Sequence, residues 1–134
     1  EKFFLNNLIT KLKIKDKVKI IGYKKNIYNY LKKSNYYIST SKWEGSSLAM
    51  IDAVFLGLPI LCSNCPTGRK EFINNDERGF LFIEGDSQDF LNKFEKMYNL
   101  DFSQLKTKLV KAKKESKKFT LLSHYSRLSN ILDI

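Results

Sequence analysis

Short apolar segments alternate with stretches of helical periodicity along this chain, and that alternation limits the fold more than any other feature of the sequence. Four segments are predicted as strands: Val18 to Ile21, Tyr36 to Ser39, Ile60 to Cys62, and GFLFI from Gly79. Apolar residues at helical spacing precede, separate and follow these segments. Strands that alternate with helices pair in parallel, with the helices packed on the faces of the sheet. The sequence therefore predicts an α/β fold with a parallel sheet of about four strands flanked by helices.

The length of 134 residues fits one hydrophobic core and is too short for two. No apolar run approaches the roughly 18 residues that a membrane-spanning helix needs. Basic residues are interleaved with the helical pattern near the start, which argues against a signal peptide. Because the sequence opens at Glu1, without a methionine and inside a helical pattern, we expect it to be a piece of a longer protein.

The net charge of +10 raises the question of a nucleic-acid partner. Of the 24 basic residues, only Arg69, Arg78 and Arg127 are arginines. Lysine is a point charge without the planar fork that recognises bases and phosphates. We therefore expect no nucleic-acid site, and interpret the charge as a lysine-rich solvated surface that attracts anionic lipid or an acidic partner.

Cys62 and Cys65 form the sequence CSNC, a spacing found in both zinc and redox sites. With no second cysteine pair and His124 as the single histidine, cysteine and histidine cannot complete a four-ligand zinc site. A redox dithiol would lie at a helix start, whereas Cys62 ends a predicted strand and Pro66 follows Cys65. We predict two structural thiols that behave as small hydrophobic groups, in a reducing, cytoplasmic compartment.

The segment WEGSSLAMIDAVFLGLPIL, from Trp43 to Leu61, contains an acid where an amphipathic helix normally has an apolar residue. If the helix starts near Ser46 or Ser47, its apolar positions form one buried stripe: Leu48, Ile51, Phe55 and Leu58. Asp52 falls on the edge of this stripe, where a carboxylate needs a polar partner. Side chains lean toward the helix start, so Asp52 points toward Glu44 and toward the free amides there. Two acids beside amides that attract anions suit a ligand with both hydroxyls and phosphates.

Several motifs, in matching order and spacing, resemble those of the retaining group 1 glycosyltransferases, which have the GT-B fold. The E-x7-E signature of that family is similar to Glu44, seven intervening residues and Asp52 in this chain. The resemblance continues with Ala53, Gly57 and Pro59. Other segments of the family are similar to the strand and glycine at IGY, the loops TSKWEG and CPTGRKE, the strand GFLF and the final KKFTLLSHYSRL. The resemblance covers nearly the whole chain.

The resemblance implies a Rossmann-like domain, the C-terminal of the two domains of a GT-B enzyme, which holds the nucleotide-sugar donor. Residues 1–134 would then be one partial donor domain that lacks its first two strands, their loops and the N-terminal acceptor domain. The absent part normally supplies the basic residues that hold the diphosphate. Lys42 is the nearest candidate for that task in this chain.

The resemblance also implies roles for individual residues. Glu44 would contact hydroxyls of the transferred sugar as the catalytic residue, because an ionised carboxylate accepts directional hydrogen bonds. Asp52 stands in place of the second glutamate of the signature, which binds the ribose diol, and is shorter by one methylene. The other donor-binding positions are Gly22, Tyr23, Ser41, Lys42, Gly45, Ser46, Ser47 and Leu48. Arg69, where similar loops often have proline, is expected on the surface, with a contact to the donor or acceptor as the alternative.

These features predict the donor-binding part of a retaining glycosyltransferase that uses a UDP-sugar and acts on a glycan or lipid-linked acceptor in surface-polysaccharide assembly. The family uses no metal, and the nucleotide-sugar is a substrate, so no cofactor is expected. The isolated chain should lack transferase activity. One alternative is a truncated, non-catalytic module that binds nucleotide or serves in assembly. Another is a lysine-rich domain in peripheral contact with the inner face of a membrane.

Overall fold

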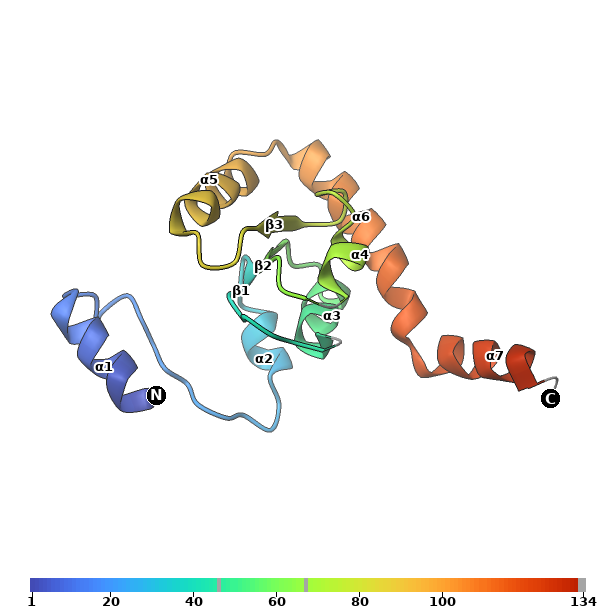
Figure 1. The fold of residues 1–134 in the computed structure, drawn as a ribbon, viewed down its shortest axis with the longest axis horizontal. Coiled ribbons are helices and arrows are strands. Elements are labelled where there is room, and N and C mark those ends of the chain that lie inside the picture. Colours follow the sequence, from blue (N-terminus) through green and yellow to red (C-terminus); the bar gives the residue numbers. More distant parts are fainter. Residues whose placement is uncertain (46, 67, 133–134) are drawn as a thin grey trace.

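The computed structural model describes residues 1–45, 47–66 and 68–132, and these form an α/β fold around a parallel sheet (Figure 1). The strands are β1 (Tyr37–Ser39), β2 (Ile60–Ser63) and β3 (Phe80–Phe82), in the order β1-β2-β3. Tyr37 lies opposite Ile60, and Leu61 lies opposite Phe80. The prediction of a parallel sheet flanked by helices is confirmed.

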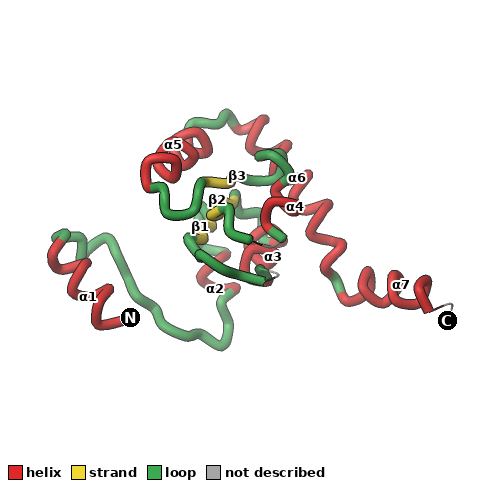
Figure 2. Tube along the Cα trace, viewed as in Figure 1, coloured by secondary structure: helices red, strands yellow, loops and turns green. Residues whose placement is uncertain are grey.

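Helices connect the strands and extend beyond them at both ends of the chain (Figure 2). They are α1 (Lys2–Lys11), α2 (Tyr28–Leu31), α3 (Leu48–Phe55), α4 (Arg69–Ile73), α5 (Ser87–Tyr98), α6 (Phe102–Ser116), the 3-10 helix η1 (Lys117–Phe119) and α7 (Leu121–Leu132). Local signals set their limits. The side chain of Asp86 caps α5 by accepting from the amides of Gln88 and Asp89. Gly57, with φ at +83°, ends α3 in the left-handed conformation that glycine adopts without strain.

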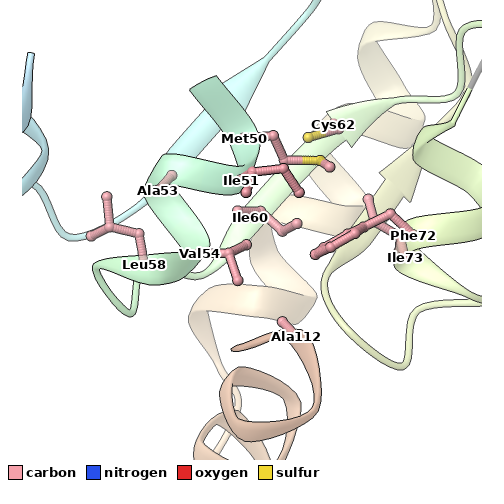
Figure 3. Close-up of a cluster of buried hydrophobic side chains, with 10 residues drawn as sticks. All are labelled: Met50, Ile51, Ala53, Val54, Leu58, Ile60, Cys62, Phe72, Ile73 and Ala112. Carbon is pink, nitrogen blue, oxygen red and sulfur yellow. The ribbon is translucent and has the colours of Figure 1, made fainter. Parts of the chain in front are cut away.

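Each face of the sheet has its own hydrophobic cluster, because side chains alternate between the faces along a strand. On one face, Ile60 and Cys62 pack with α3, α4 and α6 (Figure 3). The buried residues of that cluster are Met50, Ile51, Ala53, Val54, Leu58, Ile60, Cys62, Phe72, Ile73 and Ala112. On the other face, Leu61, Phe80 and Phe82 pack against α5. The two clusters hold the ends of the strands in fixed positions, which is what a binding site at those ends needs.

The predicted strand Val18 to Ile21 is wrong, and the described sheet has three strands where about four were expected. The segment is an irregular connection between α1 and α2 (Figure 2), and Val18 and Ile21 are 41% and 38% exposed. A strand needs a neighbour that pairs with its backbone groups. Within the described ranges no strand pairs with this segment, so an apolar pattern suited to a sheet remains irregular.

The predicted apolar stripe of α3 is only partly right. Ile51 and Leu58 are buried and Phe55 is half-buried, whereas Leu48 is 68% exposed. The residues of α3 that are buried are Met50, Ile51, Ala53 and Val54. The helix therefore turns a different side toward the sheet, one that includes a small alanine and so permits close packing. Asp52, four residues after Leu48, lies on the half-buried flank of α3 rather than against the core.

Helices α1 and α7 lie at the two ends of the molecule and project away from the sheet (Figure 1). Both helices are described throughout, and none of their residues is buried. Apolar side chains are exposed on each, including Phe3 and Phe4 on α1 and Leu121 and Ile131 on α7. Among the described helices, none has the length and the apolar character required to cross a membrane.

Candidate functional site

The loops that follow the strands meet at one edge of the sheet, because parallel strands end on the same side. The described residues of these loops are 40–45 and 47 after β1, 64–66 and 68 after β2, and 83–86 after β3. Helices α3 and α4 both begin at this edge. Ser46 lies outside the described residues, so nothing is added to its prediction. Most other predicted site residues lie in the loop after β1 or at the start of α3, and this edge is therefore the candidate site.

The carboxylate of Glu44 is held from two sides at this edge. The hydroxyl of Ser47 donates a hydrogen bond to Oε1 of Glu44 at 3.0 Å. The guanidinium of Arg69 forms an ion pair with Oε2 of Glu44. The side chain of Glu44 is 28% exposed, so solvent still reaches it. The contacts with Ser47 and Arg69 fix the orientation of this carboxylate, whose oxygens are hydrogen-bond acceptors.

Ser47 is the N-cap residue of α3, but its side chain makes no capping hydrogen bond within the described part of the chain. Its hydroxyl donates to Glu44, and its carbonyl accepts the first helical bond, from the amide of Ile51 at 3.0 Å. The first amides of α3 therefore have no cap from this side chain. Uncapped amides at the positive end of a helix attract an anion.

Arg69 contradicts the prediction that it lies on the surface, because only 1% of it is exposed. Its Nη1 donates to Oγ of Ser63 at 2.9 Å, and its Nη2 donates to Oγ of Ser39 at 2.6 Å. Burial lowers the pKa of Arg69 from its ordinary value, but a guanidinium stays charged at neutral pH. The sequence did contain a signal for this residue: Ser39 and Ser63 are polar residues at the ends of adjacent buried strands, where a buried cation could satisfy both.

Asp52 has a different partner from Glu44. The phenol of Tyr28, the first residue of α2, donates to Oδ1 of Asp52 at 3.0 Å. Glu44 lies before the first turn of α3, and Asp52 lies one turn into it. The two acids lie at the start and one turn into the same helix, and each has a partner elsewhere in the chain; that they converge on one ligand stays a prediction.

The contact between Tyr28 and Asp52 has a pH signature. The hydrogen bond to Asp52, and then its negative charge, raise the pKa of Tyr28 above the ordinary value of 10.0. A folded-state pKa above the unfolded one means that the contact contributes stability fully below about pH 10, and loses it as the pH rises through the folded-state value. In NMR titrations of isotope-labelled tyrosine, we expect Tyr28 to ionise at a higher pH in the wild type than in Asp52→Asn. Identical midpoints for Tyr28 would rule the contact out, and the other tyrosines serve as internal controls.

Gly22 and Tyr23 lie in the irregular segment between α1 and α2, away from the loop of Glu44 in the chain. Gly22 has φ at +62°, which explains a glycine there. Tyr23 is 92% exposed and packs against almost nothing. The structure therefore does not bring these two residues to Glu44, and their donor contacts stay a prediction.

The remaining predicted residues surround the end of β1. The carbonyl of Ser41 accepts from Oγ of Ser63 at 2.6 Å, which joins the loop after β1 to the end of β2. Gly45 is exposed, with open space above its backbone. Lys42 lines a hollow of about 300 Å³ on the side of the sheet covered by α5, together with Thr40, Phe82, Glu84, Gly85, Asp86, Ser87 and Phe90. Its ammonium is thus at the candidate edge, but in a different hollow from the start of α3.

Both cysteines are buried and free, so the prediction of structural thiols is confirmed. Burial, and then the neighbouring Cys65, raise the pKa of Cys62 to about 12. A thiol that stays protonated at neutral pH is a poor nucleophile. Among the described residues, no three acid, cysteine or histidine side chains are grouped as metal ligands would be.

Comparison with known proteins places this chain in one sequence family. The family model described as glycosyl transferases group 1 matches residues 1–117. The UDP-Gal:α-D-GlcNAc-diphosphoundecaprenol α-1,3-galactosyltransferase of Escherichia coli is 30% identical over 109 residues, which cover 78% of this chain and 28% of that protein. An uncharacterized glycosyltransferase of Methanocaldococcus jannaschii is 38% identical over 69 residues, covering 52% of this chain and 17% of that protein. The chain thus spans less than a third of the length of these relatives.

Solved structures agree with the sequence comparison. The crystal structure of Anabaena HepE in complex with UDP superposes with a TM-score of 0.83 at 22% identity, over 96% of this chain and 35% of that one. A glycosyltransferase from Rickettsia africae gives a TM-score of 0.84 at 22% identity, over 97% of this chain and 35% of that one. At these identities the likeness establishes the fold.

Proposed function

The chain belongs to the group 1 glycosyltransferases, as a GT-B C-terminal domain, and from this we propose that it binds a UDP-sugar donor for retaining transfer of the sugar. The observation that carries the proposal is the carboxylate of Glu44, which Ser47 and Arg69 hold ahead of the first turn of α3. A fixed anion beside helix amides that the Ser47 side chain does not cap suits a ligand with hydroxyls next to phosphates.

Glu44 is the catalytic residue in this proposal. It accepts hydrogen bonds from hydroxyls of the transferred sugar as an ionised carboxylate that Ser47 and Arg69 hold in one orientation. Its negative charge also stabilises the positive charge that develops on the sugar as the bond to the diphosphate breaks. In retaining transfer the acceptor then attacks from the face of the sugar that the diphosphate leaves.

The leaving diphosphate binds at the start of α3 in this proposal. The amides of Ser47 and Leu48 lie at the positive end of an eight-residue helix. The diphosphate can approach the backbone of Gly45 closely, because no other atom of the described residues lies near the place where a Cβ would be at this position. Lys42, in the loop after β1, adds an exposed positive charge at the same edge of the sheet, although it lines a separate hollow.

Asp52 binds the ribose diol in this proposal. Its Oδ1 already accepts from Tyr28, and further lone pairs on the carboxylate are open to the ribose. The side chain is one methylene shorter than the glutamate of the family signature, so a water bridges or the nucleotide lies closer to α3. Gly22 and Tyr23 precede α2, the helix that supplies Tyr28, and we keep them as residues near the base.

Two findings support the choice of UDP and of a lipid-linked or glycan acceptor. The solved structures of Anabaena HepE include complexes with UDP and with UDP-glucose. The Escherichia coli relative is named for transfer from UDP-Gal to a sugar on diphosphoundecaprenol, and the relative from Erwinia amylovora for amylovoran biosynthesis. We propose corresponding chemistry in surface-polysaccharide assembly, in the cytoplasm, with the acceptor held by the rest of a longer protein at the inner face of the membrane.

We further propose that residues 1–134 form one partial donor domain, and that this chain alone transfers no sugar. The large difference in length between the chain and its relatives supports this proposal. Sugar transfer from UDP-glucose by the 134 residues alone, in a turnover assay with a lipid-linked acceptor, would refute it.

Trp43 offers a direct test of donor binding, because it is the single tryptophan of the chain, is 72% exposed and precedes Glu44. We expect UDP and UDP-glucose to change its fluorescence with saturation, UDP-glucose binding about tenfold more tightly through the bonds of its sugar to a charged carboxylate. Glu44→Gln should remove that tenfold gain, and Asp52→Asn should weaken both ligands about tenfold. Glu84→Gln, which changes another exposed acid at this edge, is the matched control and should change neither.

No saturable change with either ligand, checked by calorimetry, would contradict donor binding. That result would favour a non-catalytic assembly module.

A further inference from the structure

The guanidinium of Arg69 joins parts of the chain that are far apart in sequence. Its Nη1 donates to Oγ of Ser63 at 2.9 Å and to the carbonyl of Ser63 at 3.4 Å. Its Nη2 donates to Oγ of Ser39 at 2.6 Å and pairs with Glu44. Of its five N–H groups, only the one on Nε has no acceptor among the described residues. Arg69 therefore connects the ends of β1 and β2 to the loop that holds Glu44.

The backbone around Arg69 fixes where its side chain goes. Arg69 is the first residue of α4, and Gly68 before it has φ at +61°, a conformation that other residues rarely adopt. Ser39 and Ser63 are the last residues of their strands. The carbonyl of Ser41 is held by Oγ of Ser63 at 2.6 Å, so the loop after β1 is tied to the same network. The position of the guanidinium is thus set by the sheet rather than by a mobile surface.

A buried cation of this kind is not needed for stability. Removing a guanidinium from water is unfavourable, and burial lowers the pKa of Arg69 accordingly. Well-packed apolar residues often replace a buried ion pair with no loss of stability. Arg69 nevertheless forms an ion pair with the carboxylate of Glu44, which points to a role for its charge in the site.

We propose that Arg69 is a positioning residue for sugar binding and transfer, an inference that rests on the proposed function of Glu44. The guanidinium holds Oε2 while the hydroxyl of Ser47 holds Oε1, so the plane of the carboxylate is fixed before the donor arrives. The carboxylate then meets the sugar without a further cost of ordering the side chain. The nearby positive charge also keeps Glu44 ionised, and an ionised carboxylate is the stronger acceptor.

Arginine is required here because of its shape as well as its charge. Its planar fork donates to Ser39, Ser63 and Glu44 in one plane. The lysine ammonium has three donors at one point and cannot reach the same three partners from the position of Arg69. Arg69→Lys therefore keeps the charge and loses the fixed geometry, which makes it the informative variant.

The test compares UDP with UDP-glucose by Trp43 fluorescence and calorimetry, using the whole chain. In Arg69→Lys and Arg69→Met, we expect UDP affinity to stay within twofold, because UDP does not touch Glu44 in the proposed arrangement. The tenfold gain of UDP-glucose over UDP should fall to about twofold or less. Arg78→Lys is the matched control. Arg78 also donates to main-chain carbonyls, those of Glu71 and Phe72, but it lies between α4 and β3, outside the loops that form the candidate site.

A double-mutant cycle separates positioning from general support of the fold. If Arg69 acts through Glu44, Arg69→Lys should cause no further loss of the UDP-glucose gain in the Glu44→Gln background. A purely structural role would lower UDP and UDP-glucose affinity together, in step with a lower melting temperature. NMR of the arginine side chains gives a readout without donor: the Nη protons of Arg69 should exchange slowly in the wild type and faster in Glu44→Gln.

The possible outcomes are distinct. An unchanged ratio of UDP-glucose to UDP affinity in Arg69→Lys overturns the role of Arg69 and leaves the proposed function intact. Equal affinity of the wild type for both ligands, or no binding of either, overturns the proposed role of Glu44, and the positioning role falls with it. Fast exchange of the Nη protons in the wild type overturns the positioning role independently of any ligand.

Discussion

Phe80→Ala is expected to lower the free energy of unfolding by about 3–5 kcal/mol, the usual cost of removing a buried aromatic side chain and leaving a cavity. Phe80 is 1% exposed and packs with Leu61, Phe82 and Met97 in the cluster between the sheet and α5. The Nζ of Lys108 also lies 4.8 Å from the centre of its ring, so the substitution removes a cation–π contact as well.

Chemical unfolding of Phe80→Ala, followed by near-ultraviolet circular dichroism, measures this loss. Ile83→Ala is the matched control, because Ile83 directly follows β3 and is 60% exposed. We expect the control to change the free energy of unfolding by about 0.5 kcal/mol or less. A loss below about 1 kcal/mol in Phe80→Ala would mean that the ring does not fill the space between β3 and α5.

Glu44→Ala is expected to lower the free energy of unfolding by about 3 kcal/mol, the lower end of the range for breaking a buried ion pair by removing one partner. The lower end applies because the side chain of Glu44 is 28% exposed, so water already screens part of the pair, whereas Arg69 is only 1% exposed. The cost comes from the guanidinium of Arg69, which stays buried without its negative partner.

Glu44→Gln and the double variant Glu44→Ala/Arg69→Met give the controls for this loss. Glutamine keeps an oxygen acceptor for Arg69 and should cost less than alanine does. Removing both charges should restore much of the stability lost in Glu44→Ala, because no buried charge is then left alone. If Glu44→Ala unfolds at the same denaturant concentration as the wild type, the pair carries no stability and the burial of Arg69 needs another explanation.

The regular elements that were predicted correctly share one property: their signals are local. The apolar segments at β1, β2 and β3 are short and bounded, and Asp86 before α5 is a standard helix cap. Gly57 at the end of α3 is an equally local signal. The strand expected at Val18 to Ile21 failed because pairing depends on a neighbour elsewhere in the chain, which local periodicity does not report.

The sequence pointed to the acids of the candidate site but not to the residues that contact them. Glu44 and Asp52 could be found because their spacing and the start of α3 are visible in the sequence. The partners of these acids, Arg69 and Tyr28, are 25 and 24 residues away from them and meet them only through the tertiary fold. Arg69 was expected on the surface because an isolated arginine in a loop is most often exposed. The register of β1 and β2 aligns Ser39 with Cys62 and so brings the hydroxyls of Ser39 and Ser63 together as buried partners for its guanidinium.

The exposed helices at the two ends of the molecule divide the chain into regions of unequal cooperativity. Because α1 and α7 contribute no buried side chain to either cluster, their amides are protected only by their own short helices. A solitary helix of 10 or 12 residues is marginal in water. Hydrogen exchange in α1 and α7 should therefore proceed by local fraying that leaves the sheet intact, while β2 exchanges only through global unfolding.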